Sequence, residues 1–126
     1  MMKTGMEKTS RKLIATRLET WATPGIPDVL ICDENGKFHF VELKATAGRA
    51  VDLRPHQVAW LSKHNKSSVW VLVLKLKTKT KPQEVRLYPG NKAMDLKLTG
   101  MAVEPLYLGE GDKTDWETIL GLICPI

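Results

Sequence analysis

The fold is determined by one segment of the chain, Gly25-Ile-Pro-Asp28-Val-Leu-Ile-Cys32-Asp-Glu-Asn-Gly36-Lys-Phe-His-Phe40-Val-Glu-Leu-Lys44. Its opening Gly-Ile-Pro residues indicate a turn. The apolar and β-branched residues 28–32 are typical of a strand. Residues 33–36 read as a second turn and residues 37–44 as a second strand, so we expect a β-hairpin.

The register of this hairpin decides whether its charged residues meet. A two-residue loop would pair Asp28 with Leu43 and send the Asp28 and Glu42 carboxylates to opposite faces of the sheet. A three-residue loop at 34–36 would pair Asp28 with Glu42, and it needs a left-handed residue at its end, which Gly36 supplies. We expect the three-residue loop.

In that register, three charged side chains share one face. Residues two apart on a strand point the same way, so Glu42 and Lys44 lie together, with Asp28 opposite Glu42. Cβ atoms of such cross-strand neighbours are about 5 Å apart, and two carboxylates that close repel each other unless a cation lies between them. Oxygen ligands of this kind suit Mg²⁺, with Mn²⁺ expected to substitute. With Lys44 to orient water or stabilise charge, the set predicts phosphodiester hydrolysis. The alternative is a turn aspartate beside a solvated strand edge.

The hairpin belongs to a longer series of elements. We expect a short helix in the first dozen residues, where Thr4 and Glu7 have capping-box spacing, and a strand at 13–21. A helix is expected to begin near Pro55 and end near 64–65. A strand at 68–76 should be buried on both faces. The core order is thus helix, strand, strand, strand, helix, strand (αβββαβ), an α/β or α+β domain on a mixed sheet.

The rest of the chain is expected to elaborate this core. Residues 84–88 are read as a strand, 91–98 as a helix and 114–123 as a last helix capped at Thr114 or Asp115. The length of 126 residues suits a single domain, with a catalytic core at about 7–76 and a C-terminal elaboration at about 82–126.

The basic balance favours a polyanionic partner. The formal net charge is +5 and the pI is about 9.3. We expect DNA phosphates to be contacted by Lys75, Lys77, Lys79 and Lys81, which alternate as on one face of a strand and its exit, and by Arg49 and Arg54. The other interpretation of the lysines is a charged edge that discourages sheet pairing.

Cysteine use and hydropathy indicate the compartment. Cys32 and Cys124 form no CxxC pair, and we expect both to be reduced thiols. No apolar stretch has the length of a membrane span, and no secretion signal is recognised at the N-terminus. We therefore expect a cytoplasmic protein, in the host cytoplasm if it is phage-encoded, with no membrane partner.

Three blocks of sequence resemble a known superfamily. Gly25-Ile-Pro-Asp-Val-Leu30, Phe40-Val-Glu-Leu-Lys-Ala45 and Leu53-Arg-Pro-His-Gln57-Val-Ala-Trp60-Leu61 are similar to the PD-(D/E)XK nucleases. The likeness is greatest to the VRR-NUC and Holliday-junction-resolvase-like branches, especially small phage-type nucleases, and covers roughly residues 7–74. It implies a restriction-endonuclease-like core.

The resemblance also implies roles for particular residues. Asp28, Glu42 and the Leu43 carbonyl would bind metal, Lys44 would assist the attacking water, and Gln57 would point back toward the site from the following helix. The family usually adds an acidic residue on its first helix. Glu7 is the natural match, and Glu19, just before the turn that leads to Asp28, is the rival.

The sequence thus predicts a Mg²⁺-dependent DNA endonuclease, in its sharper form a Holliday junction resolvase. Two cuts on a two-fold branched substrate would need a symmetric homodimer. The alternatives are a general nickase or single-strand nuclease with the same site, a non-catalytic DNA-binding module of the same fold, and a structural interaction protein.

Overall fold

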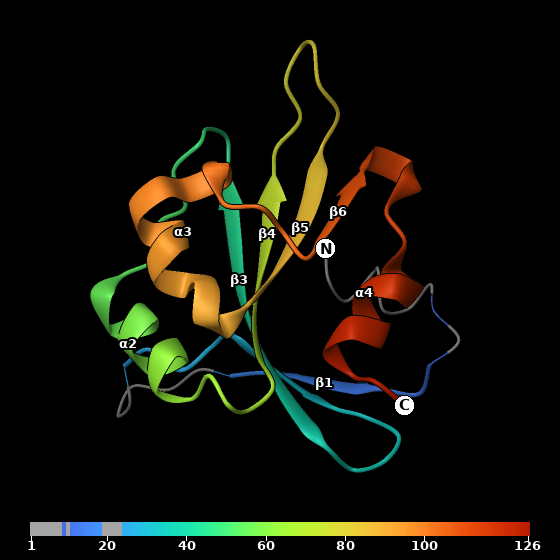
Figure 1. Ribbon diagram of the computed structural model, residues 1–126. Coiled ribbons are helices and arrows are strands. Elements are labelled where there is room, and N and C mark those ends of the chain that lie inside the picture. The colour runs from blue at the N-terminus through green and yellow to red at the C-terminus, as the bar shows by residue number, and fades with distance from the viewer. Residues whose placement is uncertain (1–8, 10, 19–23) are drawn as a thin grey trace.

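The computed structural model describes residues 9, 11–18 and 24–126. A six-stranded sheet runs through this part of the chain in the order β1-β2-β3-β4-β5-β6 (Figure 1). All neighbours are antiparallel except β3 and β4, which are parallel, so the sheet is mixed, as predicted. The strands are β1 (Ile14–Arg17), β2 (Val29–Cys32), β3 (Phe38–Thr46), β4 (Val69–Lys75), β5 (Glu84–Pro89) and β6 (Tyr107–Glu110).

Helices cover both faces of the sheet. In Figure 1, α2 (Pro55–Lys63) and α3 (Ala93–Thr99) lie on one side, and α4 (Trp116–Ile123) lies on the other. Short 3-10 turns occupy Gly90–Lys92, Gly100–Ala102 and Gly111–Lys113. None of the helices in the described ranges is both long and apolar enough to cross a membrane.

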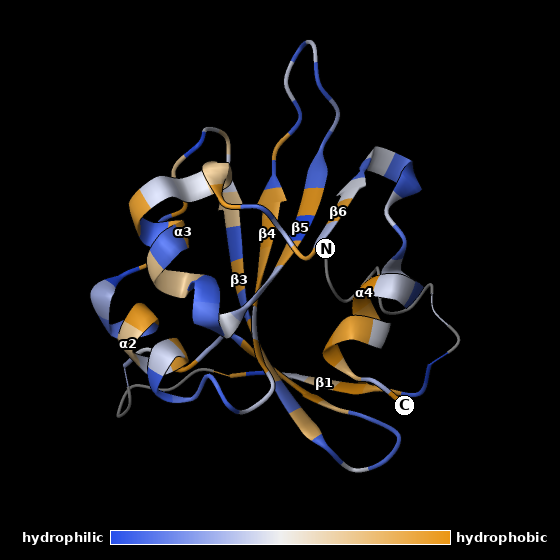
Figure 2. Cartoon of the chain, in the orientation of Figure 1, coloured by the Kyte–Doolittle hydropathy of each residue, from blue (hydrophilic) through white to orange (hydrophobic). Residues whose placement is uncertain are grey.

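Strand β4 is the centre of two apolar cores. Its Val71 and Val73 pack with buried residues of α2 and α3, whereas Leu72 packs with Ile119 and Ile123 of α4. All three β4 side chains are fully buried. Figure 2 shows the apolar residues of the strand between the helices of the two layers. The prediction of a strand buried on both faces is confirmed.

The β2–β3 hairpin has the three-residue loop that the sequence favoured. Val29 pairs with Val41, a register that brings Asp28 opposite Glu42. The Asp33 N–H donates to the Lys37 carbonyl over 2.9 Å, which closes the loop. Gly36 has a φ of 77°, the left-handed conformation that this loop requires. The register is therefore confirmed, and with it the shared face of the two carboxylates.

Helix α2 begins and ends close to its predicted bounds. Pro55 occupies its first turn, where the missing N–H costs nothing. Val58 and Leu61 are its buried residues, while Trp60 is half-buried and meets Phe40 of β3 edge to face. The helix connects the parallel strands β3 and β4, which is the usual way to join a parallel pair.

The last third of the chain extends the same sheet. Strand β5 and helix α3 lie near the predicted positions, and α4 is capped by the Asp115 side chain, which accepts from the Thr118 N–H. Strand β6 was not predicted. The expected first helix lies outside the described residues, and the first strand is shorter than the predicted 13–21.

Candidate functional site

Asp28 and Glu42 meet at the open end of the hairpin. One Asp28 oxygen, Oδ2, accepts a hydrogen bond of 3.1 Å from the Leu43 N–H. Within a strand, the N–H and C=O of one residue point to the same side. The Leu43 carbonyl therefore faces the side of the strand on which Asp28 lies.

Glu42 is buried and only partly satisfied. Its side chain is on the α2 side of the sheet, and the residue is 1 % exposed. Its Oε1 accepts from Gln57 Nε2 over 3.1 Å and lies 4.0 Å from Lys44 Nζ. Its Oε2 has no hydrogen-bond partner among the residues that the structure describes. A buried carboxylate oxygen without a partner is costly, so this atom marks a place for a proton or a cation.

The pKa of Glu42 reflects its burial and its acidic neighbour. Burial first, and then the neighbouring Asp28 carboxylate, raise the pKa of Glu42 to about 8, against the opposing effect of Lys44. A shift with these causes is frequent at functional sites and also occurs in buried structural groups. Both causes favour the protonated form of Glu42 over the carboxylate.

Gln57 is held so that its amide nitrogen points at Glu42. Its Oε1 accepts from the Arg54 backbone N–H over 3.0 Å, which fixes the orientation of the amide group. The same side chain then donates from Nε2 to Glu42 Oε1. The structure thus places Gln57 where the family resemblance implies, on α2 and facing the site.

A glycine ties the turn before Asp28 to helix α2. Gly25 has a φ of 91°, and a Cβ there would collide with the His56 carbonyl oxygen. The adjacent residue on the helix is Gln57. Close contact at Gly25 therefore places the hairpin and α2, which carry the two sides of the site, against each other.

The donor set fits a hard divalent cation. Two carboxylates and a backbone carbonyl supply only oxygen, the ligand type that Mg²⁺ and Mn²⁺ prefer. Glu42 Oε2 has no hydrogen-bond partner among the described residues, and the Leu43 N–H occupies only one Asp28 oxygen, Oδ2. The residues present therefore fit a hard divalent cation of the kind that the sequence predicted.

The expected basic residues are placed unequally. Lys75 pairs with Thr46 in β3, which puts it on the same face of the sheet as Glu42 and Lys44. The other three expected lysines follow the end of β4, in the exposed loop 76–83, where the sequence placed the exit of the strand. Figure 2 shows this mostly hydrophilic loop extending from the sheet. The lysines in the loop are Lys77, Lys79 and Lys81.

Two predicted arginines and two predicted glutamates remain to be placed. Arg49 and Arg54 are exposed in the connection between β3 and α2. Glu7 and Glu19 both lie outside the described residues. The Leu18 N–H donates to the Asp28 carbonyl over 2.7 Å, so the chain just before residue 19 runs beside Asp28.

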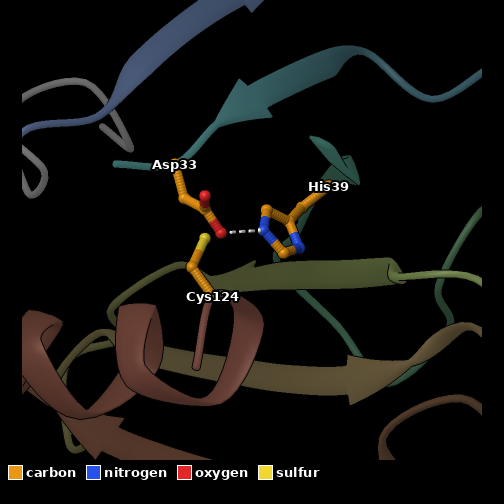
Figure 3. A group of neighbouring side chains, drawn as sticks. All are labelled: Asp33, His39 and Cys124. Carbon is orange, nitrogen blue, oxygen red and sulfur yellow. Dashed lines mark hydrogen bonds and ion pairs between the residues drawn. The ribbon is translucent and has the colours of Figure 1, made fainter. Parts of the chain in front are cut away.

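A second polar cluster lies on the opposite face of the sheet and was missed by sequence reasoning. Asp33, His39 and Cys124 are buried together, and one potential ligand atom from each lies within 4.8 Å of the others, so the group could hold a metal ion (Figure 3). His39 Nε2 is hydrogen-bonded to Asp33 Oδ2 at 2.7 Å. Burial raises the pKa of the Cys124 thiol to about 12. Both cysteines are free, as expected.

Comparisons with known proteins do not assign the chain to a family. The chain matches no model of a known protein family, and it matches none of the curated proteins with which it was compared. The likeness of its three sequence blocks to PD-(D/E)XK nucleases therefore stays an expectation.

Proposed function

We propose that the chain is a metal-dependent endonuclease that hydrolyses phosphodiester bonds in DNA, with Mg²⁺ as its cofactor. The observation that carries the proposal is the buried Glu42 Oε2, which lacks a hydrogen-bond partner among the described residues and lies in a carboxylate pair with Asp28. Two neighbouring carboxylates that are buried repel each other and lose their hydration. A cation bound between them would offset both effects and stabilise the folded chain.

Some residues of the site would bind the cation, and others would position these ligands or act on the substrate. A divalent cation held by Asp28, Glu42 and the Leu43 carbonyl would polarise a phosphate and lower the pKa of a water molecule. Gln57 keeps Glu42 Oε1 in place, and so leaves Oε2 for the cation. Lys44, with Nζ at 4.0 Å from Glu42 Oε1, is close enough to hold the attacking water or to offset developing negative charge on the phosphate.

The surroundings of the site suit a nucleic acid. The formal net charge is +5, and lysines lie both on the face of the site, at residue 75, and in the loop 76–83. Phosphate contacts from such residues give affinity without reading sequence. We infer that the loop lies along the DNA backbone while the carboxylates act at one phosphodiester.

The sharper form of the proposal is a homodimeric Holliday junction resolvase. The described residues of one chain provide the Asp28–Glu42 site, and two symmetric cuts in a four-way junction need two such sites related by a two-fold axis. A nickase or a single-strand nuclease would use the same site as a monomer. The two forms differ in substrate geometry, and their chemistry is the same.

The test compares substrates of different shape. A labelled four-way junction, a duplex and a single strand of matched sequence are incubated with the wild type and with Asp28→Ala, in Mg²⁺ and in EDTA. Paired symmetric nicks in the junction alone, lost with the variant and with EDTA, support the resolvase. Equal cutting of all three substrates supports a general nuclease. Absence of cutting with salt-sensitive binding retained would instead assign a binding module.

A further inference from the structure

We propose that Asp33, His39 and Cys124 form a structural zinc site that fastens the C-terminal end of α4 to the β2–β3 hairpin. The site lies on the opposite face of the sheet from Asp28 and Glu42, and the proposal does not depend on the nuclease activity. Asp33 and His39 belong to the hairpin, Cys124 follows α4 directly, and all three residues are buried.

The ligand set is one that zinc prefers over harder ions. It offers one carboxylate oxygen, one imidazole nitrogen and one sulfur, a mixture typical of zinc, whereas Mg²⁺ selects oxygen alone. Tetrahedral ligands at zinc distances lie about 3.5 Å from one another. The atoms here already lie within 4.8 Å of each other, so side-chain adjustments of about 1 Å would complete three of the four positions.

Both ligands at the hairpin are oriented by further hydrogen bonds. His39 Nδ1 lies 2.6 Å from Ser68 Oγ, which also accepts from Trp70 Nε1 at 2.9 Å. The second Asp33 oxygen, Oδ1, accepts from the backbone N–H groups of Asn35 and Lys37. Contacts of this kind fix ring orientation and carboxylate direction in known metal sites.

The charges of such a site would balance. A zinc ion, the Asp33 carboxylate, a Cys124 thiolate and a neutral imidazole sum to zero, which suits a buried position. Binding would release the thiol proton and remove the hydrogen from His39 Nε2. The imidazole would then carry its hydrogen on Nδ1 and donate it to Ser68 Oγ, whose own hydrogen could go to the Ile123 carbonyl at 3.3 Å.

The same place already joins three segments of the chain. Arg11 donates to the Cys124 carbonyl over 2.6 Å and to the Leu120 carbonyl over 3.0 Å. Its guanidinium also forms an ion pair with Glu34 in the hairpin loop at 2.5 Å. A metal bound beneath this contact would hold the hairpin and α4 together, and binding would be coupled to folding.

Cobalt is the probe that reports the ligands directly. The full chain is titrated with Co²⁺ and its absorption recorded. We expect about one equivalent to give visible bands of a tetrahedral ion and a near-ultraviolet thiolate-to-cobalt band, both of which disappear when one equivalent of Zn²⁺ is added. Cys124→Ser should abolish the thiolate band. The matched control, Cys32→Ser, removes the other free cysteine and should keep it.

Further measurements on the wild type do not depend on whether a variant folds. They also distinguish this site from the Asp28–Glu42 site. X-ray absorption of the zinc-loaded wild type should show one sulfur among nitrogen and oxygen ligands. Zn²⁺ should raise the unfolding temperature by several degrees, in the wild type and in Asp28→Asn alike. Excess Mg²⁺ should not displace the cobalt. A cobalt spectrum that is octahedral without sulfur, or that is unchanged in Cys124→Ser, would overturn the proposal.

Discussion

Gln57 and Glu42 are joined by a hydrogen bond of 3.1 Å that links helix α2 to strand β3. The Gln57 amide is oriented by a second bond, from the Arg54 backbone N–H, so its NH₂ group faces the carboxylate. Glu42 Oε1 is thereby occupied, whereas the buried Oε2 has no hydrogen-bond partner among the described residues. The two hydrogen bonds therefore fix the Glu42 carboxylate against helix α2.

Gln57→Leu keeps the volume of the side chain and removes both hydrogen bonds. We expect Mg²⁺-dependent cleavage to fall about 10- to 100-fold, because residues that orient a metal ligand have effects of this size. The concentration of Mg²⁺ that gives half-maximal cleavage should rise. Ser62→Ala, at an exposed position on the same helix, is the control and should leave both unchanged. Equal impairment of the two variants would contradict a positioning role for Gln57.

The stability of the metal-free chain should fall as the pH rises. The Glu42 carboxyl ionises near 4.5 when the chain is unfolded and near 8 when it is folded, chiefly because of burial. The unfolded chain therefore releases its proton first, and stability present below pH 4.5 is lost progressively up to about pH 8. One pKa unit corresponds to about 1.4 kcal/mol, so the loss is on the order of a few kcal/mol.

Denaturant unfolding in EDTA at a series of pH values measures this loss. Glu42→Gln carries a neutral side chain at every pH and should remove most of the decline between pH 5 and 8, because only the Glu42 contribution is abolished. Mg²⁺ should restore stability to the wild type at pH 8 and do little for the variant. A wild-type curve with the same pH dependence as Glu42→Gln would contradict the raised pKa.

Gly25→Ala should separate the hairpin from helix α2. The new methyl group would meet the His56 carbonyl, and the φ of 91° is itself unfavourable for alanine. We expect a decrease of about 1–3 kcal/mol in unfolding free energy and a larger loss of cleavage, since the two sides of the site move apart. Gly48→Ala is the matched control, because a methyl group there meets nothing within 4 Å. Unchanged stability in Gly25→Ala would rule out this contact.

The lysines of loop 76–83 should contribute to DNA binding and little to the chemistry. Replacing Lys77, Lys79 and Lys81 by glutamine should weaken DNA affinity. The slope of log affinity against log salt should become shallower by about 0.9 for each phosphate of duplex DNA that the variant no longer neutralises. The maximal cleavage rate at saturating DNA should change little. Fluorescence anisotropy at several salt concentrations measures the slope.

The control for this loop removes the same charge elsewhere. Lys63, Lys66 and Lys113 are exposed and lie outside both the loop and the carboxylate site. Their replacement by glutamine should leave most of the salt slope intact. If both triple variants bind DNA equally weakly, the net charge of the chain, rather than the loop, governs binding.

The hairpin could be predicted because its determinants are local. Of the two loop lengths, only the three-residue loop places Asp28 opposite Glu42, and Gly36 supplies the left-handed residue that this loop needs at its end. The helix at Pro55 and the buried strand at 69–75 likewise follow from proline placement and from a continuous apolar run. Short-range pattern was sufficient for each of these elements.

The features that were missed depend on contacts between distant residues. Strand β6 is a four-residue edge strand whose pairing with β5 is not indicated by any local alternation. Asp33, His39 and Cys124 come together only because α4 packs on the hairpin, and spacing rules for metal motifs do not detect them.

The proposed nuclease activity is tested most directly by the nicking of supercoiled circular DNA by the purified chain, with Asp28→Asn prepared in parallel. We expect the wild type to convert the circle to its nicked form in Mg²⁺ and EDTA to abolish the conversion. Asp28→Asn should bind the DNA without cutting it. Cutting by Asp28→Asn at the wild-type rate, or no cutting by a folded wild type with Mg²⁺ or Mn²⁺ on circular or branched DNA, would contradict the proposed activity.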